Sequence, residues 1–166
     1  MTSEMHSKKI VHIDELEKIV KKAKSQGKRI VWTNGCFDLL HAGHVIYLEK
    51  ARALGDMLIV GLNSDASVKK WKSPDRPLVK QLYRARVMAA LACVDYIVIF
   101  DDSSPVKLLE RLQPDFFTKG DDYSVETMDQ AERRAVEGYG GEFRFLSGVP
   151  GMSTSTLLAR IRGDKK

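Results

Sequence analysis

The stretch Thr33-Asn34-Gly35-Cys36-Phe37-Asp38-Leu39-Leu40-His41-Ala42-Gly43-His44 joins an apolar run to a segment with helical periodicity. The preceding run, Arg29–Thr33, is expected to be a strand, and a helix is expected over about His44–Leu54. Gly35 permits a tight turn whose main-chain N–H groups can face a phosphate, and the positive N-terminal end of the helix adds to the attraction. The stretch therefore predicts a phosphate-binding turn between a strand and a helix.

Two histidines stand at the entrance of that helix. His41 and His44 are separated by Ala42-Gly43, so both imidazoles can face the same side while the small residues leave room for a ligand. Two histidines alone do not make a zinc site, because a third and a fourth ligand at recognisable spacing are missing. Ordinary polar residues on a surface turn are the alternative, which the complete strand-turn-helix arrangement disfavours. The pair is best interpreted as binding phosphate.

Apolar periodicity divides the rest of the chain into alternating helices and strands. The further strands are expected over Met57–Leu62, Tyr96–Phe100, Phe116–Thr118 and Glu142–Leu146. Helices are expected from a capping box at Asp14 and Glu17 to Gly27, over Gln81–Ala92, Pro105–Leu112 and Glu126–Glu137, and from about Ser153, with a loop over Ser64–Lys80. Apolar strands between helices indicate a single α/β domain, a Rossmann-like doubly wound parallel sheet that binds ligands at the carboxyl ends of its strands.

Composition narrows the class of protein further. A chain of 166 residues with 43% hydrophobic residues suits one compact domain, and its net charge of +5 favours anionic ligands. Nucleic acid is not expected as a partner, because an RNA-binding motif and interleaved aromatics are missing. Neither a membrane span nor a secretory signal is recognisable, and Cys36 and Cys93 form no metal-ligand pair, so we expect free thiols in a cytoplasmic protein.

The run from Thr33 to His44 resembles the first signature of the HxGH nucleotidyltransferase superfamily, which includes cytidylyltransferases and several cofactor adenylyltransferases. The similarity extends from Lys9 to Arg162 and is strongest to the adenylyltransferase domain of bacterial ADP-heptose synthesis. The supporting segments are Gly61-Leu62-Asn63-Ser64-Asp65, Arg76-Pro77, Val94-Asp95, Lys119-Gly120-Asp121-Asp122-Tyr123 and Gly151-Met152-Ser153-Thr154-Ser155. The resemblance implies an HxGH nucleotidyltransferase fold, with a helical segment over 1–28, a nucleotidyltransferase domain over 29–162 and a tail over 163–166.

The implied reaction transfers AMP from ATP to a heptose 1-phosphate and gives ADP-heptose and pyrophosphate, for lipopolysaccharide or another surface glycan. The nucleophile is a phosphate oxygen that is already ionised, so catalysis reduces to positioning and to neutralising charge. Two alternatives within the superfamily stay open: a cytidylyltransferase acting on an alcohol phosphate such as glycerol 3-phosphate, and an adenylyltransferase similar to FAD synthetase. A silent nucleotide-binding module would have no need for both histidines.

The resemblance also implies site residues. His41, His44 and Lys72 are expected to be catalytic. Nucleotide-binding roles are expected for residues at strand ends and at the start of the last helix: Thr33, Asn34, Gly35, Cys36, Phe37, Asn63, Asp65, Arg76, Gly120, Asp121, Ser153 and Thr154. Asp38 and Asp65 can each hold a ribose hydroxyl, a sugar or a metal, or serve as a cap or turn residue. Mg²⁺ is expected with ATP, held by phosphates and water without an assigned protein ligand.

One segment departs from the pattern of the sugar-specific members. They usually read Lys-Gly-Gly-Asp-Tyr, whereas this chain has Lys119-Gly120-Asp121-Asp122-Tyr123, which is closer to the alcohol-phosphate cytidylyltransferases. Adenine and cytosine both carry an exocyclic amine, so Asp121 does not decide between them. The other segments that carry the resemblance favour ATP over CTP as the nucleotide. A homodimer is expected from the family, and a separate sugar kinase would supply the phosphorylated acceptor.

Overall fold

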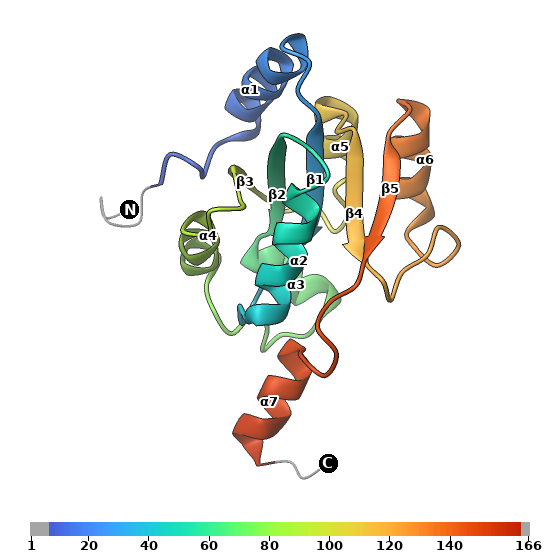
Figure 1. The fold of residues 1–166 in the computed structure, drawn as a ribbon. Coiled ribbons are helices and arrows are strands. Elements are labelled where there is room, and N and C mark those ends of the chain that lie inside the picture. The colour runs from blue at the N-terminus through green and yellow to red at the C-terminus, as the bar shows by residue number, and fades with distance from the viewer. Residues whose placement is uncertain (1–6, 164–166) are drawn as a thin grey trace.

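The computed structural model describes residues 7–163, which form a sheet covered by helices on both faces (Figure 1). The sheet has five parallel strands in the order β3-β2-β1-β4-β5. The strands are β1 (Ile30–Gly35), β2 (Met57–Asn63), β3 (Tyr96–Phe100), β4 (Phe116–Gly120) and β5 (Glu142–Leu146). The helices are α1 (Ile13–Ser25), α2 (Ala42–Arg52), α3 (Asp65–Trp71), α4 (Gln81–Ala89), α5 (Val106–Leu112), α6 (Gln130–Gly138) and α7 (Thr154–Arg162). The doubly wound parallel sheet predicted from the sequence is confirmed.

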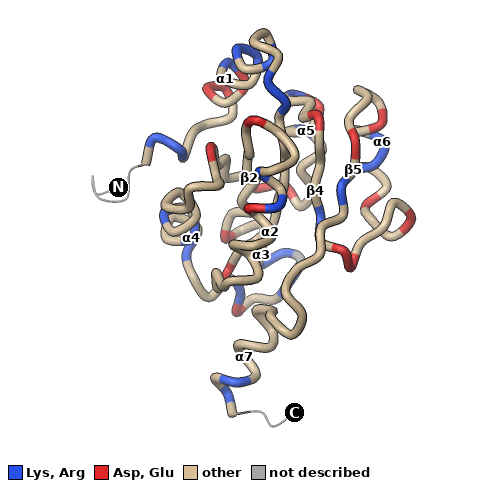
Figure 2. The backbone as a smooth tube through the Cα atoms, viewed as in Figure 1, with Lys and Arg blue, Asp and Glu red and all other residues tan. Residues whose placement is uncertain are grey.

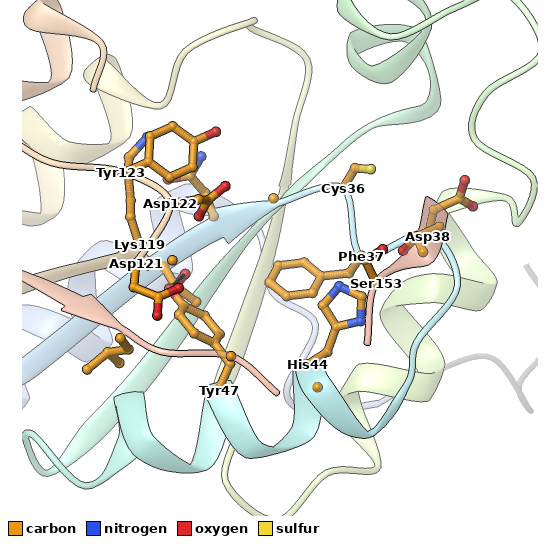
Figure 3. A pocket seen from close by; sticks show the side chains of 18 of the residues that line it. Cys36, Phe37, Asp38, His44, Tyr47, Lys119, Asp121, Asp122, Tyr123 and Ser153 are labelled. Carbon is orange, nitrogen blue, oxygen red and sulfur yellow. Dashed lines mark hydrogen bonds between the residues drawn. The ribbon is translucent and has the colours of Figure 1, made fainter. Parts of the chain in front are cut away.

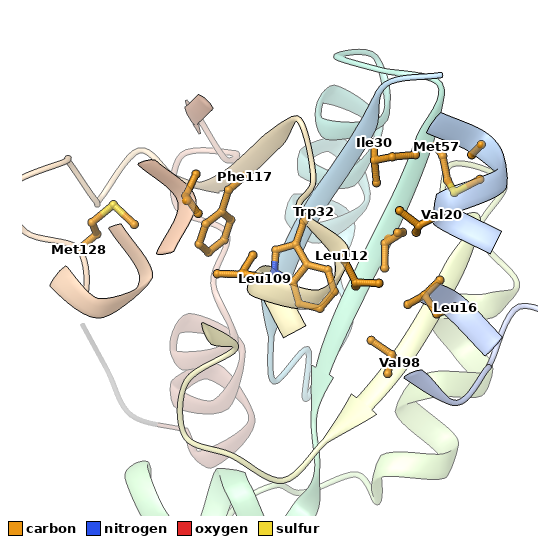
Figure 4. Packing of buried hydrophobic residues seen from close by; sticks show 13 residues of the cluster. Leu16, Val20, Ile30, Trp32, Met57, Val98, Leu109, Leu112, Phe117 and Met128 are labelled. Atoms are coloured by element: carbon orange, nitrogen blue, oxygen red, sulfur yellow. The ribbon is translucent and has the colours of Figure 1, made fainter. Parts of the chain in front are cut away.

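Alternate residues of β1 enter two separate cores, because successive side chains of a strand point to opposite faces. Ile30 and Trp32 are fully buried in the core formed with α1, α5 and α6, where Leu109 and Phe117 belong to the same cluster (Figure 4). Val31 lies in the other core, under α2 and α4. The strand order reverses at β1, so its carboxyl end is the switch point at which such sheets bind ligands.

Gly61 on β2 makes room for the largest buried side chain. A Cβ at this position would lie 2.4 Å from Cζ2 of Trp32, so only glycine allows the indole to lie across the neighbouring strand. The indole N–H donates to Oδ1 of Asn34 at 3.2 Å, so this buried side chain also holds a residue at the end of β1. Burial of Trp32 thus positions the carboxyl end of β1.

The structure corrects the start of the first helix. The sequence predicted a capping box at Asp14 and Glu17, but the N-cap is His12, whose side chain accepts from the Asp14 amide. Both acids instead pair with the guanidinium of Arg111 on α5, at 2.7 and 2.5 Å. Acids in a first turn suit the helix dipole whether or not they cap it, so the pattern was ambiguous.

Three other elements differ from the sequence prediction. The segment expected to be a loop over 64–80 contains α3, which starts because Ser64 caps it by accepting from the Ser67 amide at 3.1 Å. The helix expected from Glu126 begins at Gln130, because Asp129 accepts from two amides of its first turn. The expected helix α4 ends at Ala89, three residues early.

The N-terminal segment belongs to the same packed body as the sheet. Leu16, Val20 and Ala23 of α1 are buried in the first core, and Ile10 forms a parallel bridge to Ile97 of β3. The division into a helical segment over 1–28 packed on a domain over 29–162 stays a prediction, as does the tail, of which 164–166 lie outside the described residues. None of the described helices has the length and apolarity that crossing a membrane requires.

Candidate active site

A cavity of about 660 Å³ lies at the carboxyl ends of β1 and β4 (Figure 3). Four segments line it: the end of β1, the first turns of α2, the end of β4 with the following turn, and the segment that leads into α7. This is the switch point of the sheet, as the strand order requires. The predicted turn between β1 and α2 is therefore part of a real concave site.

His41 and His44 stack on one another at the start of α2. Their ring centroids are 3.9 Å apart, with 32° between the ring planes, and the Phe37 ring lies 5.4 Å from that of His44. Gly43 allows this arrangement, because a Cβ there would be 3.0 Å from the His41 ring. Nδ1 of each histidine is buried and has no hydrogen-bond partner among the described residues. The stacked pair is thus placed for a ligand that the protein itself does not supply.

Both imidazoles are neutral near pH 7. Burial lowers the pKa of His44 to about 4, and the neighbouring His41 and Lys72 act in the same direction. Burial also lowers the pKa of His41. A neutral imidazole carries one N–H donor, so each ring can donate one hydrogen bond to a phosphate oxygen. Lys72, which lines the same cavity, supplies a positive charge.

A hydroxyl network forms the floor between β1, α2 and β4. The Thr33 and Tyr47 hydroxyl oxygens are 2.9 Å apart, and the Tyr47 hydroxyl donates to Oγ1 of Thr118 at 3.0 Å. The Thr33 hydroxyl donates to the Thr118 carbonyl at 3.2 Å. Burial raises the pKa of Tyr47, which keeps the phenol protonated. The network joins the neighbouring strands β1 and β4 to the helix that carries the histidines.

The opposite wall of the cavity is rich in charge. The Lys119 ammonium lies 2.5 Å from Oε2 of Glu132 on α6 and 4.9 Å from the centre of the Tyr123 ring. Acidic residues follow β4 closely, and Figure 2 shows them along the turn that leads to α6. A Cβ at Gly120 would lie 2.4 Å from Oδ1 of Asp122, so glycine leaves room for that carboxylate beside the strand end.

The segment before α7 closes the site. Ser153 caps α7 through a hydrogen bond from the Thr156 amide at 3.0 Å, and both Ser153 and Thr154 line the cavity. Met152 reaches across to α2, where its Cγ is 3.4 Å from the position of a Cβ on Gly43. The start of α7 therefore faces the same space as the histidine pair.

The structure brings together most of the residues that the sequence singled out. The cavity is lined by His41, His44, Lys72, Thr33, Asn34, Gly35, Cys36, Phe37, Asn63, Gly120, Asp121, Ser153 and Thr154. Cys36 is a buried free thiol, and Cys93 is also free. Asn63 donates to Oγ of Ser67 at 3.0 Å and so fixes the start of α3.

Asp65 and Arg76 are not among the lining residues. Asp65 accepts from the Gln81 amide at 2.8 Å and from the buried Arg84 guanidinium at 2.7 Å. Arg76 pairs at 3.1 Å with Asp38, whose carboxylate also accepts from the amides of residues 78 and 79. Asp38 itself lines the cavity, so the roles that the sequence left open for it stay predictions, and its bonds to residues 76, 78 and 79 are long-range contacts rather than those of a local turn. These acids and arginines fasten the segment before α4 to the ends of β1 and β2.

Sequence reasoning missed several residues of the site. Tyr47 lies three residues after His44 and so on the same helix face, a signal that could have found it. Lys119 and Tyr123 belong to a recognised segment in which only Gly120 and Asp121 were assigned a role. Arg84 and Glu132 carry no local signal, because their contacts to Cys36 and Lys119 cross 48 and 13 residues of chain.

Residues 32–150 match the family described as cytidylyltransferase-like. The chain belongs to this family of nucleotidyltransferases. The matched range contains the histidine pair, Lys72 and the segment after β4. It ends just before α7, whose first residues complete the cavity.

Curated relatives share about half of their residues with this nucleotidyltransferase over the matched length. Bifunctional protein HldE of Geotalea uraniireducens is 51% identical over 154 residues, which cover 93% of this chain and 31% of that protein. The protein of the same name from Geobacter sulfurreducens is 48% identical over 153 residues, with coverages of 92% and 31%. The chain thus spans about a third of the length of these relatives.

Solved structures support the fold. A lipopolysaccharide core biosynthesis protein from Thermoplasma volcanium superposes with a TM-score of 0.60 at 26% identity, over 74% of this chain and 98% of that one. Pantothenate synthetase from Thermus thermophilus superposes with a TM-score of 0.59 at 15% identity, over 89% and 69%. The latter likeness is one of fold alone.

Proposed function

We propose that the chain transfers AMP from ATP to a heptose 1-phosphate and releases pyrophosphate. The observation that carries the proposal is the stacked pair of neutral histidines, with unpartnered buried Nδ1 atoms among the described residues, at the helix entrance beside Lys72. Such a site offers donors and positive charge to a triphosphate. The sugar phosphate as acceptor is supported by the relatives named HldE and by the lipopolysaccharide core biosynthesis protein.

In the proposed reaction an oxygen of the sugar phosphate attacks the α-phosphorus of ATP. A P–O bond forms to the α-phosphorus, the bond to the bridging oxygen of the β-phosphate breaks, and pyrophosphate leaves with the electron pair. The nucleophile is already an anion, so no general base is required. His41 and His44 donate hydrogen bonds to the phosphate oxygens, and Lys72 neutralises charge that develops on the leaving group. The amides at the start of α7 add further donors.

We propose that Mg²⁺ enters the site on the triphosphate. The described residues contain no group of three or more His, Cys, Asp or Glu side chains arranged to hold a metal ion. The Asp38 carboxylate is already bonded to two amides and to Arg76. Phosphate oxygens and water are therefore the proposed ligands, as is usual for this hard cation.

The base is proposed to be adenine. A cytidylyltransferase acting on an alcohol phosphate is the second candidate, and the specific observation in its favour is the sequence Gly120-Asp121-Asp122 at the cavity wall. Roles in nucleotide binding for the lining residues named above, and for Asp65 and Arg76, are part of the proposal. For Asp65 and Arg76 the proposed role is indirect, through the segment that they fasten.

The assembly is proposed to be a homodimer in the cytoplasm. Apolar side chains with 39–55% exposure gather on α4 and just before it: Leu78, Leu82, Tyr83 and Val87. A patch of exposed apolar residues on one helix suits burial against a second copy. The sugar 1-phosphate must come from an earlier phosphoryl transfer, for which we propose a sugar kinase.

The test is an assay of pyrophosphate release by the purified protein with ATP, CTP, GTP or UTP and a panel of sugar and alcohol phosphates. The expected result is release with ATP and a heptose 1-phosphate, with a nucleoside diphosphate sugar identified by mass spectrometry. Release with CTP and glycerol 3-phosphate alone would replace the proposal with the cytidylyltransferase alternative.

A further inference from the structure

Lys119 and Glu132 form an ion pair in the cavity wall that the proposed chemistry at His41 and His44 does not use. The two side chains have 15% and 6% exposure, and the ammonium-to-carboxylate distance is 2.5 Å. Removing two charges from water is costly, and such a pair is weak evidence for stability. Because stability does not explain this ion pair, its place beside the cavity suggests a role in binding the substrate.

Glu132 is held in place by its own helix. It stands in the first turn of α6, where its amide donates to the capping carboxylate of Asp129 at 3.0 Å. Burial raises the pKa of Glu132, and the attraction of Lys119 opposes that rise. Apart from this ion pair, Oε2 of Glu132 has no hydrogen-bond partner in the described part of the chain. Within the described residues, the contact that Oε2 makes is therefore the ion pair with Lys119.

The ammonium is oriented from several sides. It lies 4.9 Å from the centre of the Tyr123 ring and 5.2 Å from that of Phe117, both within the range of cation–π contact. Tyr123 is 44% exposed and lines the cavity, so it covers the ion pair from the solvent side. An ammonium has three donors, of which Glu132 occupies one.

The charge balance of this wall disfavours a phosphate as its ligand. Glu132 already neutralises Lys119, and Asp121, Asp122 and Asp129 line the same side of the cavity. A neutral hydroxyl group suits it better, because it accepts from an ammonium and donates to a carboxylate. The anionic groups of the substrates are better matched by Lys72 and the histidine pair.

We infer that Lys119 donates hydrogen bonds to the hydroxyl groups of a sugar ring and that Glu132 is the positioning residue that orients and neutralises it. Asp121 and Asp122 accept hydrogen bonds from the same hydroxyls. The ring belongs either to the acceptor sugar phosphate or to the ribose of the nucleotide. The inference rests on the proposed function in assuming that both substrates carry such a ring.

The experiment compares each substrate with its deoxy analogues in the wild type and in Glu132→Gln and Lys119→Met. The analogues are 2′-deoxyATP, 3′-deoxyATP and singly deoxygenated heptose 1-phosphates, and the measured quantity is kcat/KM. The wild type is expected to prefer the hydroxylated form of one substrate by roughly 10-fold or more, as for a hydrogen bond to a charged group. Both variants are expected to lose that preference, with a raised KM for that substrate alone.

A second readout separates positioning from structural damage. Glu132→Gln leaves the Lys119 charge uncompensated, so inorganic phosphate should inhibit this variant several-fold more strongly than the wild type, whereas Lys119→Met should show no such gain. The matched control is Glu137→Gln on the same helix, whose partner is the exposed Arg133 at 2.8 Å. It is expected to behave as the wild type. Should Glu132→Gln not fold, Lys119→Met still tests the hydroxyl preference.

The substrate whose deoxy analogue loses its penalty identifies the ring. Unchanged discrimination against every deoxy analogue in both folded variants would overturn the inference while leaving the proposed function intact. A wild type that releases no pyrophosphate with any sugar phosphate would contradict the proposed function instead. Calorimetric binding of ATP against the two deoxyATP analogues would then still test Lys119 and Glu132 on the ribose, and equal affinities for all three would count against them.

Discussion

The imidazole rings of His41 and His44 stack with their centroids 3.9 Å apart, at the N-terminus of α2 and above the carboxyl end of β1. At this separation two protonated rings would repel each other. Their surroundings keep them neutral, because burial lowers the pKa of each. The stacked pair thus acts through directed N–H donors, and Lys72 contributes the fixed charge.

Replacing either histidine should remove one of these donors. We expect His41→Ala and His44→Ala each to lower kcat by roughly two orders of magnitude or more, as when a preorganised charge-stabilising contact is lost. Steady-state pyrophosphate release measures the effect, and circular dichroism checks the fold. His12→Ala is the matched control, since His12 caps α1 in an exposed position. Near-normal turnover in a folded His41→Ala or His44→Ala protein would remove the pair from the mechanism.

The depressed pKa of His44 predicts how stability changes with pH. The folded protein holds this imidazole neutral down to about pH 4, because its pKa is lowered to about 4, whereas the unfolded chain binds the proton near the ordinary pKa of 6.5. The unfolded state therefore binds more protons between these values, and stability is lost as pH falls from about 6.5 to about 4. After a discount for partial solvent exposure, the loss is on the order of 2 kcal/mol.

Urea unfolding of the wild type and of His44→Gln at pH 7 and at about pH 4.5 measures this contribution. The variant should lose less stability on acidification, because the titrating group is gone, and the difference isolates His44 from the other titrating groups. Equal losses in the two proteins would show that His44 is not the group responsible.

The hydroxyl network beneath the site makes a separate prediction. Tyr47→Phe removes the hydrogen bond that the phenol donates to Thr118 and its 2.9 Å contact with the Thr33 hydroxyl oxygen, while Thr33 keeps its bond to the Thr118 carbonyl. We expect a loss of about 1 kcal/mol in the free energy of unfolding. Tyr123→Phe serves as the control, since Tyr123 is 44% exposed and lies outside the apolar patch on α4. The prediction fails if the two variants unfold at the same urea concentration.

The apolar patch on α4 predicts the oligomeric state. Sedimentation at micromolar concentration should show a dimer, and the double variant Tyr83→Glu, Val87→Glu should shift it to a monomer of 18.7 kDa. Ile161→Glu on α7, where the side chain is 76% exposed, provides a comparison at another apolar position. A monomeric wild type would contradict the dimer. A variant that remains dimeric would move the interface away from α4.

Much of the fold was visible in the sequence because its signals are local. Strands β1, β2 and β3 contain apolar runs, β4 begins with two phenylalanines, and β5 alternates charged with apolar residues. Gly35 with the two histidines marks the turn at the sheet's switch point. Helix α3 was missed because lysines and a following proline obscured a short helix whose cap, Ser64, is a single side chain. The capping box at Asp14 failed because a nonlocal partner, Arg111, competes for the same carboxylates.

The site was predictable only in part, because local sequence signals do not reveal contacts between residues far apart in the chain. Residues within recognised segments, such as Lys72 and Ser153, do line the cavity. In the sequence, Asp65 and Arg76 looked like ligand-binding residues in the same way as Lys72 and Ser153. In the structure each forms an ion pair, Asp65 with Arg84 and Arg76 with Asp38. Glu132 reaches the wall through its helix, and no spacing along the chain reveals that contact.

The choice of base tests the account most directly. kcat/KM should be measured for ATP and for CTP with heptose 1-phosphate as the acceptor, with the product identified by mass. A site fitted to adenine rejects cytosine by a few kcal/mol, because buried polar groups would be left unpaired, so ATP should be preferred by roughly 100-fold. A preference for CTP would contradict the assignment and would make the enzyme a cytidylyltransferase.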